Sequence, residues 1–276
     1  MKKARPLFFP NKLGVSYAIS TVVISAAIIV LVIVASSYAY QLLDQQRGAA
    51  EFEVAKESIL TFDDALENIA WKPGAAQSAR FTISYGQLEL IPASHPQASP
   101  LVINIDKNNV SLIPEPYSVS TGFLRYSVSN RYTKLWEGYS SYILGDENLI
   151  VANGTERFGR ALVEKASGYA NITLDYRVRA MKTSTITVDG VRVSYVDIWV
   201  IKLDLPEWST YIHDFNLKAR CLNVSTESYG PYSVDATDDV RVQVQYGSDS
   251  SWTGIEGIET GDVIINFILS EVKVTF

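Results

Sequence analysis

The longest apolar stretch of the chain lies near its N-terminus. No charged residue occurs between Lys12 and Asp44, and up to Tyr40 the only polar side-chain groups in this stretch are hydroxyls. About 20 apolar residues suffice to cross a membrane, because the hydrocarbon core is about 30 Å thick and an α-helix rises about 1.5 Å per residue. A charge at the centre of such a helix would cost about 2.5–3.5 kcal/mol. The pattern therefore predicts a membrane-spanning helix.

A helical pattern continues beyond this stretch in a different form. Apolar residues recur at alternating spacings of three and four, at Phe52, Ala55, Ile59, Phe62, Leu66 and Ile69. This spacing indicates an amphipathic helix with one apolar seam, whereas the intervening acids, Glu51 and Asp63 among them, are expected on its polar face. Lys72-Pro73-Gly74 ends the pattern, because proline lacks a backbone N–H and glycine favours a helix C-terminus. We expect one helix over residues 15–72, weakened at Gly48. Its seam packs on the rest of the chain or forms a coiled coil.

From residue 80 the apolar period changes from helical to strand-like. The expected strands cover residues 80–84, 87–91, 101–105, 110–113, 122–128, 170–179, 183–188, 191–203, 216–224, 239–246 and 262–276. Tyr85-Gly86 is expected to join the first two as a hairpin, and Asp189-Gly190 fits a type I′ hairpin turn. Residues 92–100 hold three prolines and are expected to form a loop. One short helix is expected at 160–166.

Together these patterns predict an α+β protein. A long hydrophobic transmembrane helix precedes a mainly antiparallel, β-sandwich-like extracellular domain. We divide the chain into a basic leader (1–14), the helix with its amphipathic continuation (15–72) and the β-rich domain (80–276). The β-rich domain is large for a single sandwich. It therefore forms either one domain or two subdomains joined near residues 140–167.

Charge sets the orientation of the helix. The apolar stretch follows Lys2, Lys3, Arg5 and Lys12, with no acid among them. Basic flanks stay cytoplasmic, so we expect the β-rich domain outside the cell. The whole chain carries a formal charge of −6, and without these four residues the rest carries −10. Nucleic-acid binding requires a basic surface, so this class of function is excluded.

Residue types that carry catalysis are sparse. The single cysteine, Cys221, alternates with polar neighbours as in a strand and is expected to be buried. His95 lies in the proline-rich loop and His213 beside an aspartate. Two histidines and one cysteine do not form a usual zinc site, and no phosphate-binding or nucleophile motif occurs. We expect no enzyme activity, catalytic residue, cofactor or metal site. The acidic run Asp235–Asp239 is expected to be a solvated turn rather than a calcium loop.

The outer part contains four Asn-x-Ser/Thr sequons, and these make it a candidate glycoprotein. The acceptors are Asn109, Asn153, Asn171 and Asn223. Glycans at such sites lie on the surface of exported proteins. Three tryptophans, Trp136, Trp208 and Trp252, lie near expected turns and are candidates for exposure.

The leader has an unusual relation to the apolar stretch. Its charged residues end at Lys12, and Gly14 stands directly before the apolar run that begins with Val15. The first 70 residues or so resemble the archaeal branch of the type IV pilin-like proteins, pilins and archaellins, which have class III signal peptides. The resemblance implies that a prepilin peptidase cuts between Gly14 and Val15 on the cytoplasmic face, and that the apolar helix is kept. Two positions depart from the family pattern: Leu13 replaces the usual basic residue, and Ile19 replaces the Glu of bacterial members.

Two other interpretations of the apolar stretch are open. The first is a plain single-pass anchor. The second is a secretory signal peptide cut at Ser37-Tyr38-Ala39, although the apolar stretch is longer than the apolar region of a usual signal peptide. The resemblance favours a pilin-like subunit of a cell-surface filament, with a β-rich adhesive or structural domain. Expected partners are membrane lipid, the prepilin peptidase, other copies or pilins through the N-terminal helices, and a surface ligand or glycan. The alternative is a membrane-anchored ectodomain, a binding or cell-envelope protein, that does not polymerise.

Overall fold

The computed structural model describes residues 12–207, 209–211 and 213–276, which form two compact units. The units are Met1–Arg47 and Gly48–Phe276. Helix α1 (Lys12–Ile69) provides the described part of the first unit and the beginning of the second. All the strands belong to the second unit, where a short 3-10 helix, η1 (Asn130–Tyr132), is also found. The protein is α+β, as predicted: one long N-terminal helix with an apolar first half precedes a mostly antiparallel, strand-rich domain.

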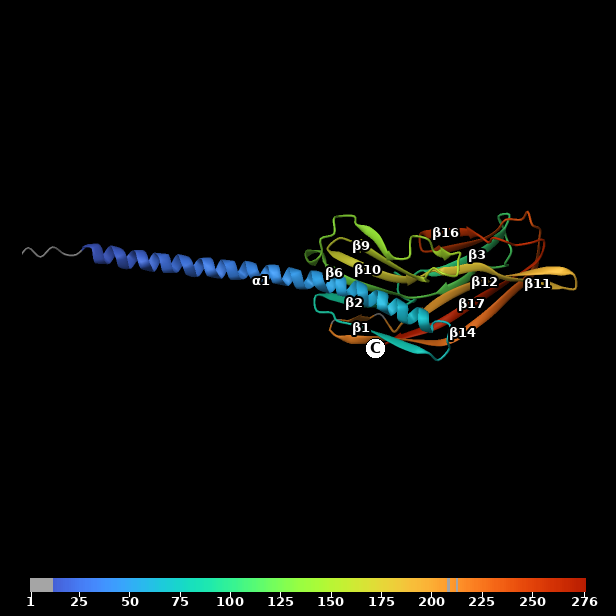
Figure 1. Ribbon diagram of the computed structural model, residues 1–276, viewed down its shortest axis with the longest axis horizontal. Coiled ribbons are helices and arrows are strands. Elements are labelled where there is room, and N and C mark those ends of the chain that lie inside the picture. Colours follow the sequence, from blue (N-terminus) through green and yellow to red (C-terminus); the bar gives the residue numbers. More distant parts are fainter. Residues whose placement is uncertain (1–11, 208, 212) are drawn as a thin grey trace, which may run out of the picture. The chain divides into compact units, whose positions relative to one another are not determined.

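The first sheet has six strands and includes the three longest strands of the second unit (Figure 1). In spatial order it consists of β1 (Ala76–Phe81), β14 (Phe215–Val234), β17 (Gly261–Thr275), β12 (Val191–Asp204), β11 (Val178–Val188) and β8 (Ile150–Val151). Two of its pairs, β12 with β17 and β11 with β8, are parallel, and the others are antiparallel.

The second sheet also has six strands, and all its pairs are antiparallel. In spatial order it consists of β13 (Ser209–Tyr211), β2 (Gly86–Ile91), β6 (Phe123–Ser129), β10 (Tyr169–Tyr176), β9 (Gly159–Lys165) and β7 (Ser140–Leu144). The third sheet has five strands, β16 (Asp249–Gly254), β15 (Val240–Tyr246), β3 (Pro100–Lys107), β4 (Val110–Ser111) and β5 (Tyr117–Ser120), the last paired with β3.

Two hydrophobic clusters use opposite faces of the first sheet. In β12, the even-numbered Val196, Ile198 and Val200 are in the cluster with the third sheet, whereas the odd-numbered Ile201 and Leu203 are in the cluster with α1 and the second sheet. Successive side chains of a strand point to opposite faces, so the same strand contributes to both cores. This shared sheet explains why Gly48–Phe276 forms one compact unit.

The seam of α1 is buried in the first of these clusters. Its members Phe52, Ala55, Ile59, Phe62, Leu66 and Ile69 are all at most 3% exposed. Figure 1 shows this part of the helix between β1 and β14 on one side and β6 and β10 on the other. The seam therefore packs on the protein's own sheets, and the coiled-coil alternative is wrong because no seam residue is accessible to a second helix.

Two local predictions are wrong. Residues 80–84 and 87–91 do not form a hairpin, because β1 pairs with β14 and β2 pairs with β6 and β13 in another sheet. The expected helix at 160–166 is strand β9, whose buried Ala161 and Val163 have a strand's alternation. The candidate join at 140–167 contains three strands of the two larger sheets, β7, β8 and β9.

The turn prediction at Asp189-Gly190 is confirmed. Asp189 and Gly190 both have positive φ, 51° and 84°, as a type I′ turn between β11 and β12 requires. Asn108 and Asn109 likewise have positive φ between β3 and β4. Helix α1 ends at Ile69, close to the predicted stop, and Gly74 has a φ of 86°.

Candidate functional site

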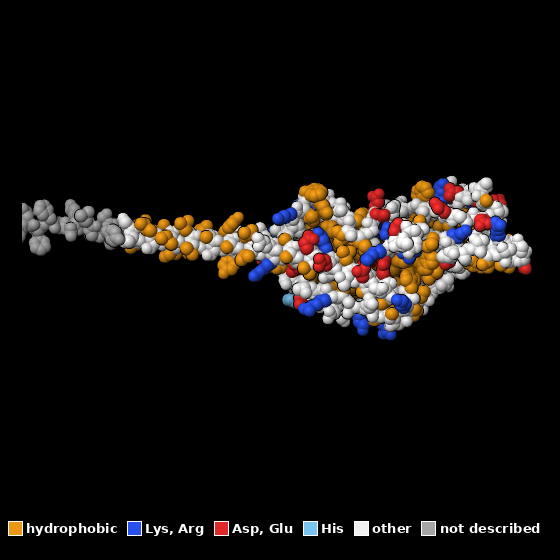
Figure 2. Space-filling model, viewed as in Figure 1, with side chains coloured by type: hydrophobic (Ala, Val, Ile, Leu, Met, Phe, Trp, Pro, Cys, Tyr) orange, Lys and Arg blue, Asp and Glu red, His pale blue; other side chains and the backbone are white. Residues whose placement is uncertain are grey.

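The most unusual surface of the described chain is the apolar part of α1. Every residue from 19 to 43 is exposed, and Val22, Leu31 and Tyr40 are exposed by 69%, 67% and 74%. Within Ile19–Ile69 the most apolar window has a mean hydropathy of 2.8. Figure 2 shows hydrophobic side chains along the visible face of this segment. A helix that is apolar on all sides requires an apolar environment, and this one is long and apolar enough to cross a membrane.

The expected cut site lies at the start of this helix. The backbone of Gly14 and Val15 is helical, since α1 begins at Lys12. Their side chains, and the leader residues 1–11, lie outside the described residues. The bond between Gly14 and Val15 therefore stays a prediction from the sequence.

A carboxylate on α1 fixes the loop that replaces the predicted hairpin. Glu51 accepts hydrogen bonds from the backbone N–H groups of Ser84, Tyr85 and Gly86, at 2.7, 3.0 and 2.8 Å, and from the hydroxyl of Tyr126 at 2.9 Å. Burial and the Glu51 charge both raise the pKa of the Tyr126 hydroxyl. The hydrogen bonds from these three amides hold the loop at residues 84–86 against α1, while the strands on either side of it pair in different sheets.

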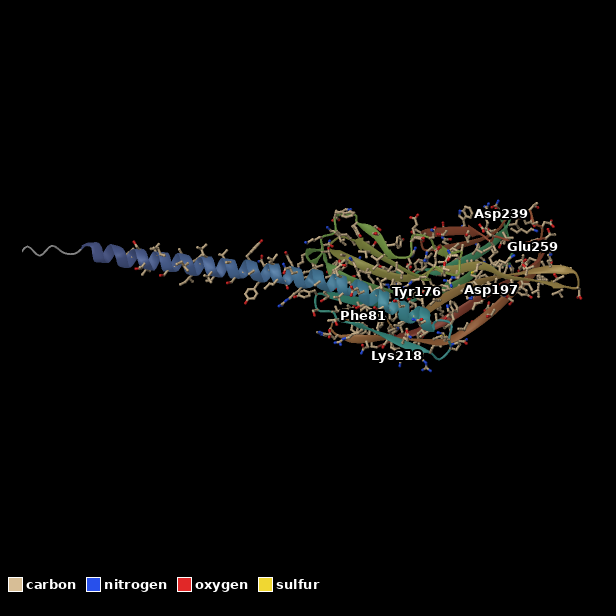
Figure 3. The ribbon with its side chains drawn as sticks, in the orientation of Figure 1. Phe81, Tyr176, Asp197, Lys218, Asp239 and Glu259 are labelled. Carbon is tan, nitrogen blue, oxygen red and sulfur yellow. The ribbon has the colours of Figure 1, made fainter. Side chains whose placement is uncertain are left out.

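A second carboxylate of α1, Asp63, is fully buried. Its Oδ2 lies 3.5 Å from Nη1 of Arg157, and neither of its oxygens has a hydrogen bond of standard geometry among the described residues. Burial, and then the nearby Glu67 charge, raise the pKa of Asp63 from 3.8 to about 7, against the opposing effects of Arg157 and the Tyr176 hydroxyl. Tyr176, which is labelled in Figure 3, belongs to the hydrophobic cluster that buries the seam of α1.

Glu51 and Asp63 were both expected on a polar helix face. The structure instead uses Glu51 as an acceptor for a distant loop and buries Asp63 completely. The contacting residues lie far along the chain, in the β domain, so no local pattern around either residue contains the signal.

The three residues considered for catalysis have separate local contacts. Cys221 is buried, as predicted, and its Sγ lies 3.1 Å from the carbonyl oxygen of Ala70. The Nδ1 of His95 accepts a hydrogen bond from the backbone of Gln97, and His213 is exposed with a φ of 100°. No group of three or more His, Cys, Asp or Glu side chains in the described part of the chain is arranged to hold a metal.

The acidic run 235–239 forms a turn closed by its own contacts. Asp238 accepts hydrogen bonds from the Asp235 backbone N–H and the Asn108 side chain, at 2.8 and 2.7 Å, and pairs with Lys107 at 3.1 Å. The hydrogen bond from the Asp235 backbone, followed by those from Lys107 and Asn108, lowers the pKa of Asp238. These contacts fit the predicted solvated turn.

The four sequon asparagines differ in their surroundings. Asn109, Asn153 and Asn223 are exposed, whereas Asn171 is half-buried on β10 and accepts a hydrogen bond from Ser127 at 2.9 Å. The indoles of Trp136 and Trp252 are exposed by 68% and 66%, as expected. Trp208 lies outside the described residues.

Comparison of the chain with protein-family models, with curated proteins and with solved structures finds no match.

Proposed function

We propose that this chain is a pilin-like subunit of a cell-surface filament. The proposal is carried by one observation: α1 exposes an uncharged apolar surface on all sides, from Ile19 to Leu43. The short basic leader that ends at Gly14 supports it, because the position of Gly14 matches the site where a prepilin peptidase would cut. The role of the protein is assembly, and the β domain is the adhesive or structural part.

Helix packing supplies the driving force for this assembly. Apolar surface that leaves the lipid or water for a protein neighbour gains dispersion contacts, and removal from water contributes about 25 cal/mol per Å². Small side chains allow helix backbones to approach closely, and the segment offers Ser20, Ala26, Ala27, Ser36 and Ala39. Because the seam of the second unit is already buried, the first half of α1 is the part that takes neighbours.

The second candidate function is a membrane-anchored ectodomain that never polymerises. It is supported by the length and apolarity of α1, which are sufficient for an anchor without further processing. Leu13 before Gly14, where the family pattern has a basic residue, also supports it.

Mass spectrometry of the native N-terminus separates these functions. We expect the protein in membranes and in sheared surface fractions to begin at Val15, because the peptidase removes the leader. A chain that begins at Met1 or Lys2 rejects the pilin-like function and favours the anchor. A chain that begins at Tyr40 rejects both, because the helix would then be a discarded secretory signal.

A substitution at the cut site adds a direct test. Gly14→Leu should abolish the processed form and the surface filament, because the resemblance places the cut directly after a glycine at this position. Asn11→Ala is the matched control within the leader and should be processed normally. Normal processing of Gly14→Leu would contradict the proposal.

A further inference from the structure

A pocket lies on the face of the second sheet that points away from α1. Arg125 of β6, Thr173 of β10 and Leu162 of β9 are directly opposite one another in the strand register, and Tyr142 of β7 continues the row. Their neighbours at Leu124, Ile172 and Val163, one residue along, point into the core with α1. The row therefore forms a floor on the outer face of the sheet.

The walls of the pocket come from distant parts of the chain. Tyr246 and Asp249 stand at the turn between β15 and β16 of the third sheet, and Gln97 comes from the proline-rich loop. The pocket has a volume of about 210 Å³. Pockets for drug-sized ligands typically have about 300–1,000 Å³, so this one fits a group about as large as a single sugar ring.

The polar side chains of the pocket are held in place. Arg160 is 6% exposed and forms a two-pronged pair with Asp175, with both N–O distances at 2.7 Å. Arg125 donates to the side chain of Gln97 at 2.9 Å. Fixed planar polar groups of this kind recognise hydroxyl groups with defined geometry.

The charges of the pocket disfavour an anionic ligand. Arg160 is neutralised by Asp175, so Arg125 is the remaining cation of the lining, which also includes the two carboxylates of Glu164 and Asp249. The tyrosine rings of Tyr142 and Tyr246 supply apolar surface beside these acceptors, as amphipathic aromatic side chains do.

We propose that this pocket binds one neutral sugar residue of a glycan. The carboxylates, Gln97 and Arg125 hydrogen-bond the hydroxyls, and the tyrosine rings contact the C–H faces of the sugar. The proposal concerns a site within Gly48–Phe276 and does not depend on filament assembly, so processing at Gly14 and sugar binding succeed or fail separately.

Saturation-transfer NMR on the full chain tests this site. The protein is kept in a phosphocholine detergent, because a maltoside detergent would itself present sugar. The probes are glucose, galactose, mannose and N-acetylglucosamine, with glucuronate and spermidine as charged alternatives. We expect transfer to at least one neutral sugar. Transfer to none of the four, or to glucuronate or spermidine alone, overturns the proposal.

Two pocket variants and a matched control locate the binding. Tyr142→Ala and the exposed Asp249→Ala should each weaken sugar binding about tenfold, which corresponds to about 1.4 kcal/mol. Trp252→Ala removes an exposed aromatic ring from the same β15–β16 hairpin but outside the pocket, and should leave binding unchanged. Binding that is lost in Trp252→Ala and kept in both pocket variants places the sugar elsewhere and contradicts the proposal.

Discussion

At the scale of single residues, Asp63 is the side chain least compatible with its surroundings. A buried carboxylate without good hydrogen bonds strongly favours its protonated form, and burial raises the pKa of Asp63 to about 7. Gly159 lies directly against this carboxyl, where any Cβ would collide with it. The surroundings of Asp63 therefore favour its neutral, protonated form over the charged carboxylate.

Asp63 makes the stability of the fold depend on pH. Between about pH 4 and pH 7 the folded state binds a proton that the unfolded state has released, so the free energy of unfolding falls as pH rises through this window. The pKa difference corresponds to about 4 kcal/mol. Asp63→Asn should remove this dependence and be more stable than the wild type above pH 7. Denaturant unfolding of the full chain at pH 5 and pH 8, followed by tryptophan fluorescence, measures it.

Asp64→Asn is the control for this prediction. The Asp64 side chain is 54% exposed and pairs with the same arginine, Arg157, and exposed ion pairs contribute at most about 1 kcal/mol. Its pH profile should follow that of the wild type. If Asp63→Asn kept the wild-type slope between pH 5 and pH 8, the buried carboxyl would not be its source.

At the scale of elements, α1 has two halves with opposite surroundings. Residues 19–43 are exposed throughout, whereas the seam from Phe52 to Ile69 is buried by the protein's own sheets. The second unit begins at Gly48. This glycine was expected to weaken the helix, but its structural reason is close approach: a Cβ there would overlap the ring of Tyr132.

Gly48→Ala is therefore expected to destabilise the second unit. In an ordinary helix interior this change stabilises by about 1 kcal/mol, but overpacking typically costs about 1–3 kcal/mol. We expect lower stability in the wild-type background and higher stability in a Tyr132→Ala background, where the ring is gone. A double-mutant cycle by chemical unfolding measures both. A stabilising effect of Gly48→Ala in the wild-type background would show that Tyr132 does not restrict this position.

The elements were predicted well where one local pattern decides them. The helix, its seam, the Asp189-Gly190 turn and most strands follow from periodicity and turn chemistry. The predicted hairpin at Tyr85-Gly86 is absent because β1 and β2 pair with distant strands of different sheets, and the loop between them is bound by Glu51, more than 30 residues earlier. The helix predicted at 160–166 was wrong because this segment is a strand, β9, whose pairing with β10 and β7 is not visible in its own short sequence.

At the scale of the whole molecule, the proposed function places the apolar segments of neighbouring chains side by side. Packed helices are about 8–10 Å apart, so a cysteine at Ala27 should react with its counterpart through a short bismaleimide linker. The native Cys221 is buried and should not react. We expect covalent dimers of Ala27→Cys in sheared surface fractions, seen on denaturing gels.

Ala236→Cys is the control for this cross-link. Ala236 is exposed in the turn before β15, so it reports random collisions between β domains. More dimer from Ala27→Cys than from Ala236→Cys supports assembly through the helices. Equal yields, or no dimer from Ala27→Cys, would favour the plain anchor.

The sequence by itself determined the features that depend on neighbours in the chain. An uncharged apolar run, a three–four apolar spacing and alternating strands each reflect the periodicity of one element, so they specified an apolar helix with an amphipathic continuation, followed by a β-rich domain. The leader with Gly14 supplied the functional hypothesis in the same way, from adjacent residues.

Only the tertiary structure decided how these elements combine. The first sheet uses both faces and joins two hydrophobic clusters into one unit, and Glu51 and Asp63 acquire roles from strands far along the chain. The pocket on the second sheet draws its floor from β6, β7, β9 and β10 and its walls from the third sheet and a loop. Contacts of this kind join residues that are far apart in the chain, so the local pattern of apolar and polar residues around each of them does not reveal its partners.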